Sequence, residues 1–178
     1  DAGGITGGRG RMRALTAPLP AQFCQTPVPP APAFTPRPML ADQGAMVGVA
    51  FGQMQAETLA KLGALWPLRI TPWRMVLLEG ARAMPQIAGL VAADDPILNI
   101  YACVGAPACK QALGPTRDLA RRLAPLTTQR LHITGCAKGC AHPRPAPLTI
   151  TATATGYELT GSGIAAQSGL TPDQLAQW

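Results

Sequence analysis

The sequence predicts an α+β fold in which two small ordered regions follow a lead without regular structure. Glycine, arginine and proline crowd residues 1–42, and proline fixes its own backbone dihedral and lacks a hydrogen-bond donor. From about residue 45, short apolar runs typical of strands alternate with segments of helical spacing. The chain has 178 residues, 47% hydrophobic and 13% charged, so it can bury one ordinary core or a small one plus a half-domain.

Residues 1–42 are therefore predicted to be a poorly ordered linker. Its first part combines glycine with Arg9, Arg11 and Arg13, and its second part is rich in proline. Cys24 lies in this linker, where a lone thiol is predicted to be incidental.

Residues 43–82 are predicted to form a strand, a helix and two further strands. The helix carries leucines near one face, and a proline stops it. The expected elements are a strand at 46–51, a helix at 55–65, and strands at 68–71 and 74–78. This order is about half of a ferredoxin-like unit.

Residues 83–178 are predicted to form a small α/β layer domain, because helices and strands alternate along them. Thr116 is expected to be the N-cap of its main helix. The expected elements are helices at 85–91, at 116–123 and from 172, strands at 97–102 and 131–134, and a hairpin of 148–154 with 157–160.

The formal net charge of +6 favours an anionic partner. Nucleic acid is not expected, because the arginines are scattered and aromatic residues make up only 4%. A small polyanionic ligand fits better. No apolar run is long enough to span a bilayer and no secretion signal is visible, so we expect a cytoplasmic protein without a membrane partner. Cysteines in that compartment favour metal binding or catalysis over disulfides.

Four of the five cysteines form two pairs that predict a 4Fe-4S cluster. The pairs are Cys103 with Cys109, spaced C-x5-C, and Cys136 with Cys140, spaced C-x3-C. A cubane needs four thiolates and a slim backbone that can approach its sulfides, and both segments are rich in glycine and alanine. Zinc is the main alternative, but its knuckles are usually two tight C-x(2–4)-C pairs, and only the second pair fits. Inert or redox cysteines are the remaining alternative.

These cysteine segments resemble the nitrite/sulfite reductase family. The resemblance covers roughly residues 45–165 and includes two upstream motifs. The matching segments are Ala102-Cys103-Val104-Gly105-Ala106-Pro107-Ala108-Cys109, Gly135-Cys136-Ala137-Lys138-Gly139-Cys140-Ala141, Phe51-Gly52-Gln53 and Thr71-Pro72-Trp73-Arg74. The residues around the cysteines in these segments resemble most the precorrin-3B synthase branch of the family.

The resemblance implies a fold and a cofactor. Family members pair two ferredoxin-like half-domains with two larger α/β domains, and this chain resembles the C-terminal half of that arrangement. Residues 43–82 would then be the second ferredoxin-like half-domain, and 83–178 the 4Fe-4S domain. The four cysteines would bind one 4Fe-4S cluster, and in the reductases the ligand matching Cys140 also bridges to the iron of sirohaem. Sirohaem or a mononuclear non-haem iron is a further candidate cofactor, and a missing N-terminal half is an expected partner.

The resemblance also implies an activity. The synthase branch is a monooxygenase of cobalamin biosynthesis that hydroxylates a precorrin and closes a lactone, so precorrin-3A and an electron donor are the expected partners. One alternative is part of a sirohaem-dependent sulfite or nitrite reductase. A second alternative is a non-catalytic 4Fe-4S module that works only with a partner half.

Three cations are predicted to bind the substrate. By resemblance, Arg69 and Arg74 face the tetrapyrrole cavity, and guanidinium groups bind carboxylates through paired hydrogen bonds. Lys138 lies between two cluster ligands, where it would alter the electrostatics of the cluster or touch substrate. The alternative for all three is an ordinary solvated side chain. No catalytic residue is assigned.

The other cations and both imidazoles are predicted to have no functional role. A solvated helix face is expected for Arg117, Arg121 and Arg122. For His132 and His142, a hydrogen-bonded or exposed ring is expected.

Overall fold

The computed structural model describes residues 5–6, 9–10, 18–19, 21–23, 36–142, 144 and 146–177. The chain divides into two compact units, Asp1–Thr35 and Pro36–Trp178. In the first unit, strand β1 (Ile5–Thr6) pairs antiparallel with β2 (Arg9–Gly10), and Ala21–Phe23 form a single 3-10 turn. Most of the predicted linker, including Cys24, lies outside the described residues.

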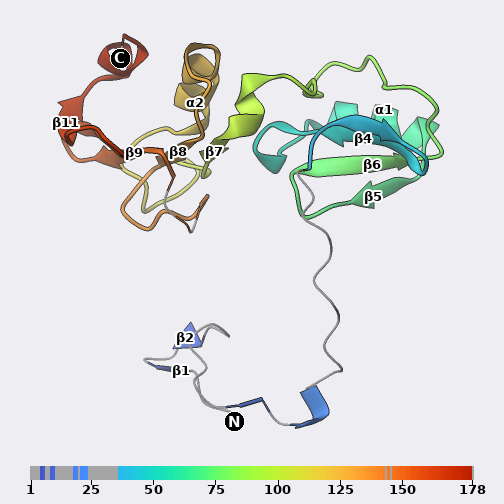
Figure 1. Ribbon diagram of the computed structural model, residues 1–178, viewed down its shortest axis with the longest axis horizontal. Helices are drawn as coiled ribbons and strands as arrows, with labels where there is room; N and C mark the ends of the chain where they lie inside the picture. The colour runs from blue at the N-terminus through green and yellow to red at the C-terminus, as the bar shows by residue number, and fades with distance from the viewer. Residues whose placement is uncertain are drawn as a thin grey trace. The chain divides into compact units, whose positions relative to one another are not determined.

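The first part of the second unit is a four-stranded antiparallel sheet with one helix (Figure 1). The strand order is β3-β4-β6-β5, and helix α1 packs on the sheet through Leu62, which is fully buried. The elements are β3 (Met39–Ala41), β4 (Gly44–Gly48), α1 (Ala56–Leu65), β5 (Leu68–Ile70) and β6 (Met75–Glu79). The expected strand–helix–strand–strand order is present, with one strand added before it.

Two expectations need correction. Met39–Ala41 form β3 within the segment assigned to the linker, so the linker ends earlier than residue 42. The proline just before this edge strand favoured the prediction of a linker, although an edge strand tolerates proline. The helix expected at 85–91 is absent, since this fully described segment forms only a turn and a bridge residue. Gly89 has a φ of 92°, and the carbonyl of Ala88 accepts a hydrogen bond from the Thr58 hydroxyl instead of a helical one.

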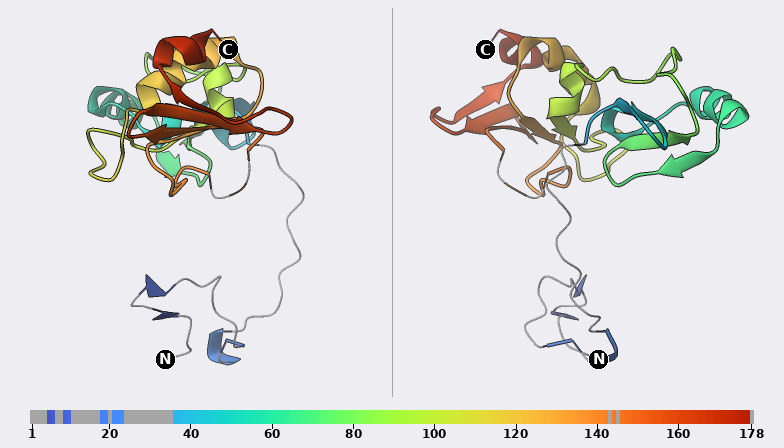
Figure 2. Two further views of the ribbon diagram at one scale, coloured as in Figure 1. Left: turned by 90° about the vertical axis from the view of Figure 1, so that its left-hand side faces the viewer. Right: turned by 45° about the vertical axis from the view of Figure 1, so that its right-hand side comes forward.

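The second part of the unit is a five-stranded mixed sheet of order β11-β10-β9-β8-β7 (Figure 2). Neighbouring strands β7, β8 and β9 are parallel, while β9, β10 and β11 are antiparallel. Strand β11 was not expected from the sequence. The elements are η4 (Pro96–Asn99), β7 (Ile100–Ala102), α2 (Arg117–Leu123), η5 (Ala124–Leu126), β8 (Leu131–Thr134), β9 (Leu148–Thr153), β10 (Gly156–Gly161), β11 (Gln167–Leu170) and α3 (Pro172–Ala176).

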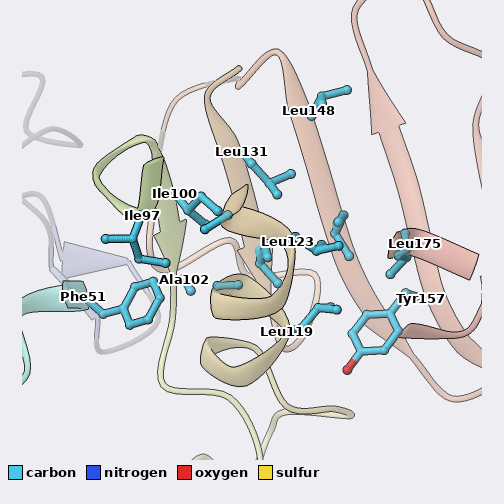
Figure 3. Packing of buried hydrophobic residues seen from close by; sticks show 14 of the residues in the cluster. Phe51, Ile97, Ile100, Ala102, Leu119, Leu123, Leu131, Leu148, Tyr157 and Leu175 are labelled. Atoms are coloured by element: carbon cyan, nitrogen blue, oxygen red, sulfur yellow. The ribbon is translucent and has the colours of Figure 1, made fainter. Parts of the chain in front are cut away.

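Helices α2 and α3 cover one face of this sheet and bury its apolar side chains (Figure 3). Ala102, Ile133 and Ile150 are partners in the parallel register, so they lie on the same face, where Leu119 and Leu123 of α2 pack. Because side chains alternate across a strand, the opposite face carries the other register row, Tyr101, His132 and Thr149. One face of the sheet is thus a conventional core, and the other is aromatic and polar.

Phe51 joins the two parts of the unit. It follows β4 in the chain, yet it packs in the core of the second sheet beside Ile97 and Ala102 (Figure 3). The amide of Val91 also donates to the carbonyl of Gly48. Among the described residues, no helix is both long and apolar enough to cross a lipid bilayer.

Leu62→Ala should lower the free energy of unfolding by about 2–5 kcal/mol, because it leaves a cavity between α1 and its sheet. Leu65→Ala is the matched control one turn later, where the side chain is 61% exposed, and it should change stability by less than about 0.5 kcal/mol. Urea unfolding followed by circular dichroism measures both. Equal losses would contradict the packing of α1.

Candidate functional site

All four paired cysteines line one cavity of about 370 Å³. Cys103 directly follows β7, and Cys136 follows β8 after one intervening residue. Because β7 and β8 are parallel neighbours, their carboxyl ends meet at the same edge of the sheet. Cys109 and Cys140 come from the turns that leave these two strands, and Cys140 is the exposed member of the set. The structure thus brings together the four residues predicted as cluster ligands.

Backbone hydrogen bonds tie the two cysteine segments into one unit. The amide of Cys103 donates to the carbonyl of Ile133 at 3.3 Å, and the amide of Leu113 donates to the carbonyl of Gly135 at 2.7 Å. The amide of Gly135 donates to Sγ of Cys103 at 3.2 Å. Hydrogen bonds of this kind to sulfur stabilise a metal-bound thiolate and tune its cofactor.

Glycine is required where the two segments touch. Gly105 has a φ of 66°, and a Cβ atom there would lie 2.6 Å from Oγ1 of Thr116. A Cβ atom on Gly135 would lie 2.6 Å from Cβ of Ala112 and 3.3 Å from Cα of Gly105. The two segments therefore approach each other backbone to backbone, which a larger residue at either position would prevent.

The residues of the cysteine cavity are compatible with a cubane. Within the described residues, no group of three or more His, Cys, Asp or Glu side chains is close enough to hold one metal ion. Zinc needs its ligands about 2.3 Å from a common centre. A 4Fe-4S cluster binds each thiolate at a separate corner, so its ligands surround a larger body. Four cysteines line a largely apolar cavity and an amide donates to one sulfur, features that a cluster-binding site shares.

Arg74 reaches this cavity from the first sheet. Its guanidinium donates from Nη1 to the carbonyl of Ile100 at 2.8 Å and from Nη2 to that of Leu98 at 3.2 Å, and it lies 4.5 Å from the ring centre of Tyr101. Burial lowers the pKa of Arg74, and the Tyr101 phenol opposes the shift. Its φ of 58° is rare for a residue other than glycine. Since a guanidinium has five N–H donors, Arg74 keeps donors for a ligand.

The structure does not bring Arg69 to the same place. Arg69 forms an ion pair with Glu79, with Nε 2.6 Å from the carboxylate, and its side chain is 69% exposed. Among the described residues that line the cysteine cavity, Arg69 does not occur. An exposed pair of this kind contributes little to stability.

Lys138 lines the cavity and joins the two cysteine segments. Its ammonium group donates to Oε1 of Gln111, a residue of the first segment that also lines the cavity. Both side chains are exposed. Lys138 therefore lies at the solvent side of the cysteine cavity.

Phe51 closes another side of the cavity. It is buried with a φ of 56°, a conformation that costs a bulky residue about 1–3 kcal/mol. The guanidinium carbons of Arg117 and Arg121 lie 5.9 and 5.1 Å from its ring centre. Nη1 of Arg117 also donates to Oε1 of Gln53 at 2.5 Å. The solvated role expected for these arginines is wrong for Arg117, which is half-buried against the Phe51-Gly52-Gln53 segment.

An aromatic stack extends from Arg74 along the polar face of the second sheet. Tyr101 stacks on His142 at 4.5 Å between ring centres, and His142 meets the edge of His132 at 6.0 Å. Both imidazoles are buried, and burial lowers the pKa of each; nearby arginines including Arg144 lower that of His142 further, and His142 lowers that of His132. Nε2 of His132 has no hydrogen-bond partner among the described residues. Sequence spacing gave no signal for this stack, because its members come from two strands and a turn.

Comparison with solved structures identifies the class of fold. The structure of the NirA protein of Mycobacterium tuberculosis matches this chain with a TM-score of 0.59 and 20% sequence identity. The match covers 83% of this chain and 37% of NirA. The chain therefore has the fold of the nitrite/sulfite reductase type, as the sequence predicted.

Comparison with curated proteins narrows the relationship. A protein named Precorrin-3B synthase, from a Sinorhizobium species, is 32% identical over 141 aligned residues. The alignment covers 67% of this chain and 30% of that protein, so the chain spans less than a third of its relative. No family model matches the chain. The resemblance to the precorrin-3B synthase branch is confirmed.

Gly105→Ala should lower the free energy of unfolding by about 3 kcal/mol or more, because a left-handed backbone and a steric clash add together. Gly80→Ala is the matched control, since Gly80 has a φ of 76° but nothing within 4 Å of the added Cβ atom. That variant should lose only the backbone strain of about 1–2 kcal/mol. Denaturant titration of both variants measures the difference, and equal losses would contradict the close approach of the cysteine segments.

Proposed function

We propose that this chain is the cluster-binding part of an iron–sulfur oxidoreductase of the precorrin-3B synthase type. The observation that carries the proposal is a single cavity lined by all four paired cysteines together with Arg74 and Lys138. The similarity to a precorrin-3B synthase supports the same proposal.

The four cysteines would bind a 4Fe-4S cluster, which supplies one-electron transfer when bound. The chain's own part is to hold and shield it. The Gly135 amide donates to Sγ of Cys103, and Phe51 closes one wall of the cavity. Removing water and adding hydrogen bonds to sulfur both shift the potential at which a cluster accepts an electron.

The substrate in this proposal is a polycarboxylate tetrapyrrole, a precorrin. Arg74 and Lys138 line the cavity, carry positive charge and retain N–H donors beyond those already used within the chain. Carboxylates bind such groups through charge-assisted hydrogen bonds. Arg69 is paired to Glu79 away from the cavity, so the proposal assigns carboxylate binding to Arg74 and Lys138.

The reaction proposed for the whole protein is hydroxylation of precorrin-3A with lactone formation, dependent on an electron donor. This chain spans 30% of the curated relative, and in this proposal a partner half would supply the rest of the catalytic cavity. The role of this half would be electron relay and substrate anchoring.

Anaerobically purified chain should contain about four irons and four acid-labile sulfides, as four thiolates around a cubane require. Changing any one of Cys103, Cys109, Cys136 or Cys140 to Ser should lower both contents and bleach the visible absorbance. Cys24→Ser is the matched control and should keep both. Metal analysis and absorption spectra provide the measurement.

Stoichiometric zinc, or a cluster that survives these substitutions, would overturn the proposal. Intense additional visible bands of sirohaem would instead identify a sulfite or nitrite reductase part.

Lys138→Gln should weaken the binding of uroporphyrin III, an octacarboxylate porphyrin, about tenfold, because a charge-assisted hydrogen bond is lost. The effect should shrink as salt is raised. Lys110→Gln removes an exposed charge from the same region without touching the cavity lining and is the control. Fluorescence titration of the porphyrin measures both, and equal affinities for the two variants would refute substrate anchoring by Lys138.

A further inference from the structure

Two buried threonines hold the first cysteine of each pair. Oγ1 of Thr116 donates to the carbonyl of Cys103 at 2.6 Å, and Oγ1 of Thr134 donates to the carbonyl of Cys136 at 2.7 Å. The two threonines are 1% and 3% exposed. The same chemical device therefore occurs once in each cysteine segment, from different elements of the fold.

Thr116 makes this bond in place of the one its position favours. It is the N-cap residue of α2, where a threonine hydroxyl normally accepts from a helix amide. No amide of α2, a helix that the structure describes in full, donates to this hydroxyl. The side chain instead points to the Cys103 carbonyl, 13 residues earlier in the chain. The Thr116 hydroxyl therefore donates to the carbonyl of Cys103, a predicted cluster ligand, and does not cap the helix.

The surroundings of Thr116 fix it in that orientation. Gly105 leaves the space for its hydroxyl, since a Cβ atom on Gly105 would lie 2.6 Å away. On the other side, the phenol of Tyr157 donates to the carbonyl of Pro115 at 2.8 Å, and burial raises the pKa of that phenol, so it stays a donor. The residue before Thr116 is thus anchored to β10.

Thr134 does the same at the end of β8. Its hydroxyl reaches forward two residues to the Cys136 carbonyl, at the point where the strand gives way to the turn. Thr151 is its register partner on β9 and lies on the same face of the sheet. Thr151 therefore serves as a control position for Thr134, since it belongs to neither cysteine segment.

We propose that Thr116 and Thr134 are positioning residues that set the direction of the Cys103 and Cys136 thiolates toward the cluster, an inference that rests on the proposed function. A hydrogen bond to a cysteine carbonyl restrains the peptide plane that follows it, and so limits the directions that the Cα–Cβ bond can take. Without the hydroxyl, the carbonyl loses its partner and this plane can rotate. The cluster would then be bound by the same four sulfurs with a looser and altered geometry.

The test compares T116V and T134V with T116S, T134S and T151V in the full chain, after anaerobic reconstitution with iron and sulfide. Each valine should raise the rate of cluster loss to an iron chelator about three- to tenfold, the effect of one lost hydrogen bond. It should also change the electron paramagnetic resonance spectrum of the dithionite-reduced cluster. Both serine variants and T151V should match the wild type in rate and spectrum.

Several outcomes overturn the inference. If T116V and T134V both lose the cluster at the wild-type rate and give the wild-type spectrum, this inference is wrong but the proposed function stands. If the wild-type chain takes up no cluster, the proposed function is wrong as well. Lower thermal stability with an unchanged spectrum would reduce the threonines to a purely structural role. If a valine variant does not fold, Thr116→Ala or Thr134→Ala removes the hydroxyl without adding an apolar branch and keeps the test decisive.

Discussion

The parallel pairing of β7 with β8 is the constraint on which the site depends. It puts Cys103 and Cys136 at the same sheet edge, although more than thirty residues separate them in the chain. The remaining contacts refine that placement: amides join the two cysteine segments, glycines let their backbones touch, and two hydroxyls fix the cysteine carbonyls. The apolar face of the sheet, covered by α2 and α3, provides the rigid support, while the opposite face carries the aromatic stack.

The first sheet completes the cavity through two residues in unfavourable backbone conformations. Phe51 and Arg74 both have positive φ values and both line the cysteine cavity. The amide of Val49 donates to the carbonyl of Arg74 at 3.0 Å, so the chain just before Phe51 is tied to Arg74. Strain of this kind persists only where surrounding contacts hold it. Here those contacts are the arginines packed on Phe51 and the carbonyls that accept from Arg74.

The sequence predicted most of the fold and the grouping of the cysteines, because both depend on local periodicity and on spacing. It failed where tertiary contacts decide. Strands β3 and β11 are short edge strands whose residues carry little β signal, and pairing with a neighbour creates them. The helix expected at 85–91 is absent because Gly89 packs against Thr58 in a left-handed conformation. From the sequence alone, the same prediction applies to Arg69 and Arg74. In the structure, Arg69 pairs with a carboxylate on the neighbouring strand and stays exposed, whereas Arg74 donates to two backbone carbonyls and lines the cavity.

The forked contact of Arg74 with Leu98 and Ile100 has a mechanical consequence. Those carbonyls belong to the segment that enters β7, and β7 ends at Cys103. The Arg74 guanidinium therefore links the first sheet to the strand that ends at Cys103, together with the Val91–Gly48 hydrogen bond and the packing of Phe51. A ligand that binds the remaining donors of Arg74 would therefore contact a group that is already hydrogen-bonded to the strand ending at Cys103.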